Sequence, residues 1–499
     1  MASCSKFVLL CIFFTRLSLL VAEQRLMLSL THSLSKAQFT SAHSLLKTTS
    51  MRSAARHRRH SKPPQVSLPL SPGSDYTLSF SLGSDPSRTQ NLSVYMDTGS
   101  DLVWFPCSPF ECILCDGKYP PIGGAAAGFS PINVSASTLL PCKSRACSAA
   151  HSSLPSSDLC AIAKCPLASI EMSDCAEFAC PSFYYAYGDG SLIAQLHKDS
   201  LTVTSGSGDP LILHNFTFGC AHSALAEPVG VAGFGRGFLS LPAQLANFSP
   251  ELGNQFSYCL VSHSFDSDKI RQLSPLILGR AAIDDQKRGE VDGSNNKGRI
   301  VYTSMLDNPK YPYFYSVGLE AISVGARRIP APEELRRVDR HGNGGVVVDS
   351  GTTFTMLPPE LFNSVAAELD RRVRRVFKRA TDAEERTGLS PCYYLDGNKT
   401  KGANADLIVP SLALHFVGNS SVVLPRRNYF YEFIDGVVKG GRVGCLMLMN
   451  GGDGDGGGPG ATLGNYQQQG FEVVYDLEKR RVGFGRRRCA SLWDSLNHR

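Results

Sequence analysis

The sequence places an aspartate on a glycine-containing turn at two positions, and this pair of aspartates could carry out acid–base chemistry. Asp97 opens a segment Asp-Thr-Gly-Ser, and Asp349 opens a segment Asp-Ser-Gly-Thr. Glycine has no Cβ, so two such turns can approach each other closely. Two carboxyl groups at hydrogen-bonding distance share a proton, since like charges that close do not both ionise readily. The ionised group would be a base for water and the protonated one an acid for a carbonyl oxygen, which predicts hydrolysis without a covalent intermediate.

The two aspartates belong to an internal repeat. Each follows an apolar run, and a proline, Pro106 or Pro358, comes nine residues after each of them. An apolar segment with glycine lies downstream of each copy, at 231–235 and at 461–464. A single Asp-Thr-Gly means little, because Asp-Gly pairs are common in turns. Two copies with matched flanks predict two related lobes, each of which contributes one carboxylate.

Short strands are the elements that would position these turns. With 46 glycines and 29 prolines, the chain breaks into short apolar or alternating runs bounded by turn residues, a pattern typical of β structure. The strands we expect are Tyr76–Leu82, Leu92–Met96, Leu201–Val203, Leu211–Phe218, Val346–Val348 and Val422–Leu424. The glycine-rich stretch 451–460 is expected to be a loop.

One segment has the helical period instead. Apolar residues recur from Phe362 to Phe377, and basic residues lie between them at Arg371, Arg372, Arg374, Arg375 and Lys378. The basic face has two interpretations: a solvated surface, or a docking surface for an acidic cell-wall polysaccharide.

Length and composition divide the chain into four parts. A chain of 499 residues with 42% hydrophobic residues is too long for one simple core. Residues 1–22 combine Lys6 with an apolar run and predict a secretory signal peptide; a membrane anchor is the alternative. Residues 23–67 are polar and end in the basic run Arg56–His60, which predicts a propeptide or, alternatively, a disordered tail. We expect a first lobe with a cysteine-rich insertion over 68–300 and a second lobe over 301–499.

The net charge of +6 comes from the leader. Residues 1–67 hold 10 of the 50 Lys and Arg but one of the 44 Asp and Glu, which leaves 40 against 43 for the rest. The body, at a formal −3, gives no support to nucleic-acid binding. Opposite charges could hold the leader on the body, and acid pH would then release it as carboxylates are protonated.

Cysteines and glycosylation sequons also indicate the secretory route. Of 16 cysteines, Cys4 and Cys11 lie in the signal, and 14 remain. Behind a signal peptide, this even number predicts disulfides rather than a metal site, so we expect no metal. The disulfide candidates are Cys107, Cys112, Cys115, Cys142, Cys147, Cys160, Cys165, Cys175, Cys180, Cys220, Cys259, Cys392, Cys445 and Cys489. The sequons, which predict N-glycosylation, begin at Asn91, Asn133, Asn215, Asn247, Asn398 and Asn419.

Further motifs extend the repeat into a family resemblance. They are, in order, Tyr-Gly-Asp-Gly-Ser at 187–191, Phe-Gly-Cys at 218–220, Gly-Phe-Gly-Arg-Gly at 233–237, Phe-Ser-Tyr-Cys at 256–259 and Leu-Gly-Asn-Tyr-Gln-Gln-Gln at 463–469. Together with the two aspartate turns, this pattern from Tyr76 to Cys489 resembles the pepsin-like aspartic proteases, and among them the plant nepenthesin-like branch. Cys175 and Cys180 depart from that branch's pattern, which leaves the pairing within the insertion open.

The resemblance implies a mainly β, bilobal pepsin-like acid protease fold with a cleft between the lobes, no cofactor, and a monomer. It implies that Asp97 and Asp349 are the catalytic dyad and that Cys392 pairs with Cys445. The residues implied to support the dyad are Thr98, Gly99, Ser100, Ser350, Gly351 and Thr352. In these turns, Ser100 and Thr352 would orient the carboxyl groups, and Thr98 and Ser350 would brace the loops. Tyr187 and Gly188 would belong to a flap over the substrate, with Trp104 as the hydrogen-bonding partner of the tyrosine.

Two functions therefore compete. The first is a secreted aspartic endopeptidase that acts on protein or peptide substrates at acid pH, in the apoplast, the cell wall or the vacuole. The second is a catalytically silent binding or inhibitor protein of the cell wall on the same fold; such proteins lose the aspartate-containing turns, which are intact here. A serine or metallo-hydrolase has no support, because the sequence contains neither Gly-x-Ser-x-Gly nor His-Glu-x-x-His.

Overall fold

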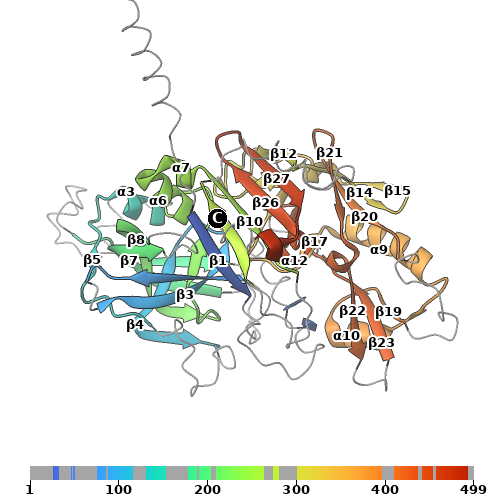
Figure 1. The fold of residues 1–499 in the computed structure, drawn as a ribbon, viewed down its shortest axis with the longest axis horizontal. Helices are drawn as coiled ribbons and strands as arrows, with labels where there is room; N and C mark the ends of the chain where they lie inside the picture. Colours follow the sequence, from blue (N-terminus) through green and yellow to red (C-terminus); the bar gives the residue numbers. More distant parts are fainter. Residues whose placement is uncertain are drawn as a thin grey trace, which may run out of the picture.

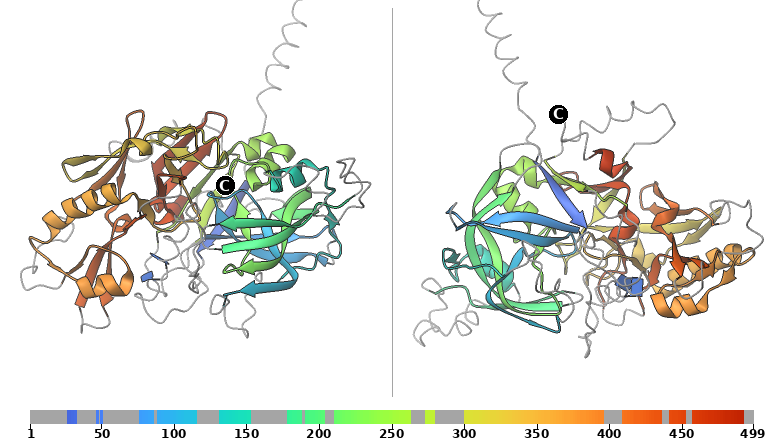
Figure 2. Two further views of the ribbon diagram at one scale, coloured as in Figure 1. Left: turned by 180° about the vertical axis from the view of Figure 1, so that it is seen from behind. Right: turned by 60° about the horizontal axis from the view of Figure 1, so that its bottom comes forward.

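The computed structural model shows two β-rich lobes side by side, the first in blue to green and the second in yellow to red (Figure 1). Figure 2 shows the same arrangement from behind and with the bottom turned forward. The structure describes residues 26–32, 46–47, 49–50, 76–85, 88–115, 131–152, 178–187, 190–203, 210–262, 273–279, 300–395, 409–435, 441–452 and 457–492. The expectation of a mainly β, bilobal pepsin-like fold is confirmed.

The first lobe is built on long antiparallel strands, above all the pair β7 and β8. Its strands are β2 (Tyr76–Leu82), β3 (Gln90–Asp97), β4 (Trp104–Ile113), β5 (Thr138–Leu139), β6 (Phe183–Tyr187), β7 (Gly190–Val203), β8 (Leu211–Leu225) and β9 (Val231–Gly233), and its helices are α3 (Arg145–Ala150), α6 (Leu241–Phe248) and α7 (Pro250–Gly253).

The second lobe carries two four-stranded sheets besides its share of the central sheet. One joins β15 (Arg327–Pro330), β14 (Leu319–Val324), β20 (Leu412–Phe416) and β21 (Ser420–Leu424); the other joins β18 (Lys378–Arg379), β19 (Cys392–Tyr394), β23 (Gly441–Leu446) and β22 (Phe430–Asp435). Its other elements are β13 (Ser316–Val317), β16 (Val346–Val348), β17 (Thr355–Leu357), β24 (Leu448–Asn450), β25 (Ala461–Leu463), α9 (Pro359–Val373), α10 (Thr381–Thr387), α12 (Asn465–Gln468), η6 (Glu333–Leu335) and η7 (Arg426–Asn428).

An antiparallel sheet joins the lobes. Its strands lie in the order β1 (Leu26–His32), β11 (Ser274–Leu278), β10 (Gln255–Cys259), β26 (Phe471–Asp476), β27 (Arg481–Arg486) and β12 (Val301–Leu306). β10, which belongs to the region 68–300 expected to form the first lobe, pairs with β26 near the end of the chain, with Gln255 opposite Asp476. The largest buried cluster includes Phe256 and Tyr475, whose stacked rings lie 4.6 Å apart. The lobes therefore share one core.

The internal repeat has matching strand pairings in the two lobes. β3 runs parallel to β9, with Asp97 opposite Gly233, and β16 runs parallel to β25, with Val348 opposite Leu463. β4 and β17, which follow the two aspartate turns, are in turn antiparallel to β9 and β25. The downstream segments of the sequence repeat are therefore the strands that flank the two aspartates.

The expected strands all lie within observed strands, and two of them, Tyr76–Leu82 and Val346–Val348, have the bounds that the pattern predicts. The expected helix is shorter than its apolar pattern: α9 ends at Val373, and Lys378–Arg379 belongs to strand β18. Phe377 is still buried, because a turn after α9 brings it onto the core. The pattern predicted its burial but not the end of the helix.

Part of the segment assigned to the propeptide is integrated into the fold. β1 pairs with β11 over five residues and with β2 over two, and Met27, Leu28 and Leu30 are buried. Farther along, Leu46 packs in a second-lobe cluster with Phe354, and Ser50 Oγ donates a hydrogen bond to the Thr387 carbonyl at 3.2 Å.

The signal peptide lies outside the described residues, and the division of the chain at 22, 67 and 300 stays a prediction. None of the helices in the described ranges is both long and apolar enough to cross a membrane.

Candidate active site

Two turns at strand ends bring the aspartates into the site. Asp97 is the last residue of β3, and Asp349 directly follows β16. The three residues of β16 are buried and apolar, and so are Val94, Tyr95 and Met96 directly before Asp97 in β3. Each carboxyl group therefore lies where a buried strand gives way to a turn. Asp349 is 8% exposed, whereas Asp97 is of intermediate exposure.

Each carboxyl group is held within its own turn in the same way. Asp97 Oδ2 accepts a hydrogen bond from Ser100 Oγ at 2.6 Å and Asp97 Oδ1 one from Gly99 N at 2.9 Å. In the second turn, Asp349 Oδ2 accepts from Thr352 Oγ1 at 2.6 Å and Asp349 Oδ1 from Gly351 N at 2.7 Å. The hydroxyl three residues after each aspartate thus fixes one carboxyl oxygen, and the glycine N–H fixes the other.

The residues after the aspartates join the two turns to each other. Thr98 N donates to Ser350 Oγ at 3.0 Å, and Ser350 N donates to Thr98 Oγ1 at 2.8 Å. The same hydroxyls donate across the repeat to carbonyls of the opposite strand, Thr98 Oγ1 to Val348 at 3.1 Å and Ser350 Oγ to Met96 at 3.1 Å. All four bonds are buried, so the loops form one rigid unit.

A glycine permits the close approach of the two turns. A Cβ built on Gly99 would lie 2.7 Å from Asp349 Cγ and 2.8 Å from each of its carboxyl oxygens. Any side chain at this position would therefore displace the Asp349 carboxyl group. The first turn thus lies directly against the carboxyl group of the second.

A buried polar network lies behind the second turn, and its residues are not among the site residues predicted from the sequence. Gln468 Nε2 donates to the carbonyl of Asp349 at 3.2 Å, and Asn465 Nδ2 donates to that of Ser350 at 2.9 Å. Tyr258 donates to Gln468 Oε1 and lies 2.8 Å from the hydroxyl of Tyr475. Burial raises the pKa of Tyr258 well above its ordinary value, so its hydroxyl keeps its proton. Tyr258 lies in the motif 256–259, and Asn465 and Gln468 lie in the motif 463–469. These two motifs, which belong to the family resemblance, are the part of the sequence that indicated these residues.

The expected flap is described only in part. Tyr187 is the last residue of β6 and pairs with Gly190 across the hairpin, whereas its side chain and Gly188 lie outside what the structure describes. Trp104 opens β4 and is 1% exposed in a core cluster that includes Leu192 of β7. Their roles in substrate binding stay predictions.

Five disulfides join described cysteines. They are Cys107–Cys220, Cys112–Cys115, Cys147–Cys180, Cys259–Cys489 and Cys392–Cys445, the last being the pair that the family resemblance implied. Cys142 is described, buried and not in a disulfide, and Cys160, Cys165 and Cys175 fall outside the described ranges. Three cysteine pairs in the insertion share one sequence spacing, at 142/147, 160/165 and 175/180. The Cys147–Cys180 disulfide joins cysteines of two different pairs, so the shared spacing does not reflect the disulfide pairing.

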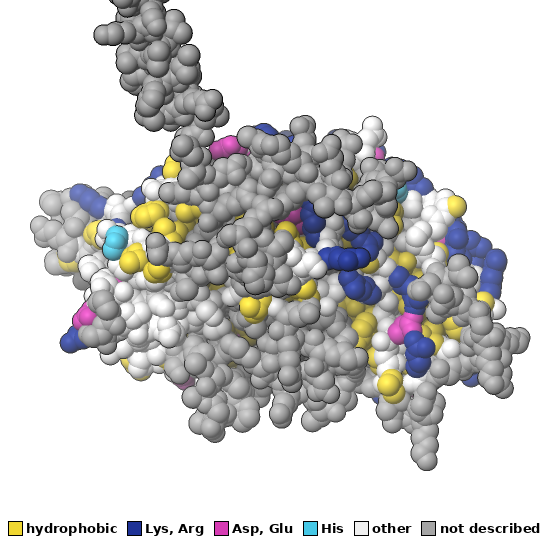
Figure 3. All heavy atoms as spheres, in the orientation of Figure 1, with side chains coloured by type: hydrophobic (Ala, Val, Ile, Leu, Met, Phe, Trp, Pro, Cys, Tyr) yellow, Lys and Arg dark blue, Asp and Glu magenta, His cyan; other side chains and the backbone are white. Residues whose placement is uncertain are grey.

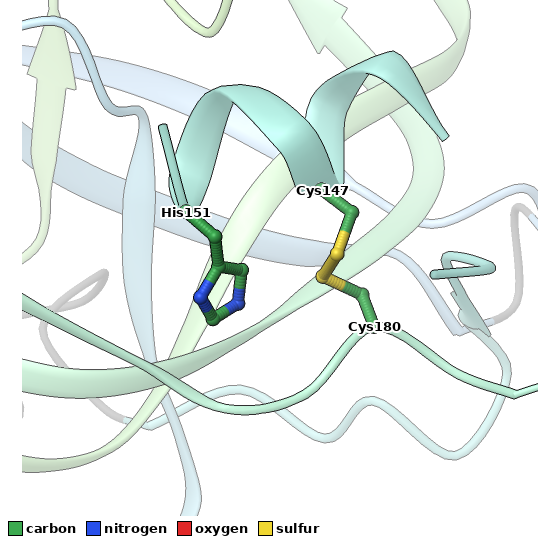
Figure 4. Close-up of side chains that lie close together, drawn as sticks. All are labelled: Cys147, His151 and Cys180. Carbon is green, nitrogen blue, oxygen red and sulfur yellow. A yellow bond between two sulfur atoms is a disulfide. The ribbon is translucent and has the colours of Figure 1, made fainter. Parts of the chain in front are cut away.

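One cluster of potential metal ligands accompanies a disulfide. Ligand atoms of Cys147, His151 and Cys180 lie within 4.8 Å of one another, but the two sulfurs are bonded to each other (Figure 4). His151 Nε2 lies 3.2 Å from the Pro181 carbonyl oxygen. A disulfide offers no thiolate to a metal ion, so this cluster is a disulfide cross-link beside a buried histidine.

The glycosylation candidates that the structure describes are accessible. The asparagines of five sequons are exposed, and Asn398 lies in a stretch outside the description; the five are Asn91, Asn133, Asn215, Asn247 and Asn419. Their use stays a prediction.

Comparison with known proteins places the chain among plant proteins of one fold. Residues 76–280 match the family described as xylanase inhibitor N-terminal, and residues 314–486 match xylanase inhibitor C-terminal. A probable aspartyl protease of Arabidopsis thaliana is 60% identical over 448 residues, 86% of this chain and 85% of that protein. Nepenthesin-1, an aspartic proteinase of Nepenthes gracilis, is 29% identical over 422 residues, 84% of this chain and 78% of that protein.

Solved structures of low sequence identity share the fold. Basic 7S globulin from soybean superposes with a TM-score of 0.57 at 17% identity, over 93% of this chain and 96% of that one. Conglutin gamma from lupine seeds gives a TM-score of 0.57 at 17% identity, over 93% and 95% of the two chains.

Proposed function

Because this chain belongs to the plant family of pepsin-like aspartic proteases, we propose that it is an aspartic endopeptidase that hydrolyses peptide bonds at acid pH. One observation carries the proposal. The two aspartates sit on turns that interlock through Thr98 and Ser350, and Gly99 leaves room for the Asp349 carboxyl group against the first turn. Interlocked turns of this kind hold the two carboxyl groups in a fixed relation, which a reaction that uses both at once requires.

The proposed reaction needs one proton between the two carboxyl groups. The ionised group takes a proton from a water molecule as the water oxygen attacks the peptide carbonyl carbon, and the protonated group gives its proton to the carbonyl oxygen. In the second step the protonated carboxyl group gives its proton to the leaving nitrogen, the ionised one takes a hydroxyl proton from the tetrahedral intermediate, and the C–N bond breaks; the dyad again holds one proton. The products are a carboxylic acid and an amine. The proton belongs to the pair, so neither aspartate is assigned a fixed role.

The compartment is part of the proposal. Five disulfides among the described cysteines favour an oxidising route, and the exposed sequons fit a glycosylated surface. We propose that the protein enters the secretory pathway and works on protein or peptide substrates in the acidic apoplast, cell wall or vacuole.

A second candidate function is a protease-fold binding protein without activity. The names of the two matched family models, which refer to xylanase inhibitors, favour this alternative. The two aspartates and the hydroxyl groups that donate hydrogen bonds to them argue against this alternative, because a protein that only binds its partner needs no such pair of oriented carboxyl groups.

The test is digestion of a denatured protein mixture at about pH 4, where exposed carboxyl groups titrate, with and without a statine-type inhibitor. We expect cleavage that the inhibitor stops and that Asp349→Asn lowers about 10³-fold or more, because an amide can neither hold the charge nor pass the proton. Asp339→Asn is the matched control. Asp339 Oδ1 also accepts a hydrogen bond from the N–H two residues on, at 2.8 Å, but on an exposed turn.

Two results would contradict the proposal. The first is substantial activity in purified, folded Asp349→Asn protein. The second is a wild-type chain that cleaves nothing at acid pH yet lowers the activity of an added endoxylanase, which would establish the binding alternative.

A further inference from the structure

A second carboxyl group lies four residues after Asp97, and the proposed mechanism does not use it. Asp101 follows Ser100 in the loop between β3 and β4; the residue as a whole is partly exposed, but its carboxyl group is largely buried. Its Oδ1 accepts a hydrogen bond from Gly237 N at 2.7 Å, across 136 residues of sequence. Asp101 does not take part in any of the ion pairs found among described residues, so within this part of the chain its charge has no cation as direct partner.

Three glycines form a cradle around Asp101. They lie at alternate positions of the segment 233–237, which we call the glycine loop. A Cβ on Gly237 would lie 1.5 Å from Asp101 Oδ2, one on Gly235 2.6 Å from Asp101 Oδ1, and one on Gly233 2.4 Å from the Asp101 carbonyl carbon. None of the three has a positive φ, so it is the space occupied by Asp101, rather than the backbone conformation, that requires glycine here.

The glycine loop is bonded to the first catalytic turn. Backbone hydrogen bonds run from Phe234 N to the Asp97 carbonyl at 2.7 Å and from Gly235 N to the Ser100 carbonyl at 2.8 Å. Ser100 in turn donates to the Asp97 carboxyl group. The hydrogen bond from Gly237 N to Asp101 Oδ1 adds a third link, at the end of the glycine loop. Asp101 is therefore connected to the dyad through the backbone of the turn that carries Asp97 and Ser100.

The second lobe holds the other side of the glycine loop. Arg236 N donates to the Tyr313 carbonyl at 3.0 Å, and the Tyr315 hydroxyl donates to the Phe234 carbonyl at 2.8 Å. The glycine loop therefore lies between the first catalytic turn and the second lobe. A shift of this loop would change how the two halves of the dyad meet.

The charged and titratable groups around Asp101 come from three elements. Asp97 lies on the same loop as Asp101. Arg236 lies on the glycine loop, and its guanidinium is 3.7 Å from Asp307. Tyr315, which is buried, belongs to the second lobe. Burial raises the pKa of Asp101 from 3.8 to about 6, and the Gly237 hydrogen bond offsets this only in part. Negative charge on Asp101 also contributes to raising the pKa of Tyr315.

We propose that Asp101 is a positioning residue that clamps the glycine loop to the first catalytic turn in its neutral, protonated form, so that the site is held best at acid pH. This inference rests on the proposed function and deepens it. A protonated carboxyl group can still accept the Gly237 hydrogen bond, and it avoids a negative charge in a cradle where no described residue forms an ion pair with it. An ionised Asp101 would need water or a shift of the glycine loop to stabilise its charge.

The test compares Asp101→Asn and Asp101→Ala in the full chain, with Asp339→Asn as control. Asparagine keeps the acceptor and is always neutral, whereas alanine removes the clamp. At about pH 4, we expect Asp101→Ala to lower kcat about tenfold or more through a misplaced turn, and Asp101→Asn to restore most of that loss. As the pH rises to about 6–7, Asp101→Asn should keep a larger fraction of its own acid activity than the wild type does.

Thermal unfolding gives a second readout that needs no activity. A carboxyl group whose pKa is higher in the folded state adds stability below about pH 4, and this stability is lost as the pH rises through about 6. The Tm of the wild type should therefore fall relative to that of Asp101→Asn between pH 4 and 7, and Asp339→Asn should follow the wild type.

Failure of the inference and failure of the proposed function give different results. If the wild type cleaves substrate but Asp101→Asn shows the pH profile and the Tm dependence of the wild type, or loses as much activity as Asp101→Ala, the inference is wrong and the protease function stands. If the wild type cleaves nothing, the protease function fails, and the Tm comparison alone decides whether Asp101 is a neutral clamp.

Discussion

At the residue scale, the site depends on hydroxyl groups that orient the carboxyl groups. Ser100 and Thr352 occupy equivalent places in the repeat, and each donates at 2.6 Å to an aspartate oxygen. The chain itself therefore shows that a serine and a threonine hydroxyl can fill the same position. Because these bonds are to the dyad and not to a substrate, their loss should affect the chemical step more than binding.

We predict that Ser100→Ala lowers kcat about 10–100-fold and changes KM little, because the Asp97 carboxyl group loses a fixed donor. Ser100→Thr should restore most of the activity, as the second turn suggests. The measurement is kcat and KM on one peptide substrate at acid pH. A rise in KM at unchanged kcat, or equal losses in the two variants, would show that Ser100 does not orient the dyad.

At the element scale, helix α9 changes the interpretation of the basic face. The side chain of Glu368 is fully buried, and its oxygens lie 2.8 Å from Arg371, 2.6 Å from Arg372 and 3.1 Å from Arg327. Arg374 lies 3.8 Å from Asp370. Figure 3 shows Lys and Arg side chains gathered over the second-lobe half of one face, but both arginines of α9 are already paired with Glu368. Docking to an acidic polysaccharide stays a prediction, and it would depend mainly on Arg375 and Lys378.

We predict that Glu368→Gln lowers Tm at pH 6 and has a smaller effect near pH 2. The hydrogen bond from Arg371, together with those from Arg372 and Arg327, lowers the pKa of Glu368 from 4.5 to about 2. A carboxyl group with a lower pKa in the folded state stabilises the protein above about 4.5, and this contribution is lost as the pH falls toward 2. Thermal unfolding at several pH values measures it. Glu385→Gln, on the exposed side of α10, is the control and should change Tm little at any pH.

At the scale of the whole molecule, the sheet that joins the lobes includes a strand from the expected leader. β1 is held by ladder hydrogen bonds to β11 and by the burial of Leu28 and Leu30. Neither contribution titrates. Charge attraction between a basic leader and an acidic body is therefore at most part of what holds residues 26–32.

We predict that the fragment containing β1 stays bound after the leader is cut near Arg56–His60, at pH 7 and at about pH 4. The experiment mixes Asp349→Ala precursor with a trace of active enzyme and identifies the peptides that co-elute with the body. High salt at neutral pH should not release the fragment, because its main contacts are not ion pairs. Release at acid pH combined with retention at neutral pH would show that charge is the dominant attraction after all.

The repeat, the two aspartates with their hydroxyl partners, most of the strands and the family could be predicted from the amino-acid sequence. These features are local: a strand needs a pattern of a few residues, and each aspartate with its hydroxyl lies within four consecutive positions. The motifs 233–237 and 463–469 were also visible in the sequence, although their contacts with the active site were not.

Which distant residues meet can be seen only in the folded structure. Gly237 lies 136 residues from Asp101, and Gln468 lies 119 residues from Asp349, and no spacing rule links such partners. The same holds for three other features: the Cys147–Cys180 disulfide, the ion pairs of the α9 arginines with Glu368, and the place of β1 in the sheet that joins the lobes. Each depends on how the lobes pack and on which charges are buried together, and burial is a property of the folded chain that a local pattern does not contain.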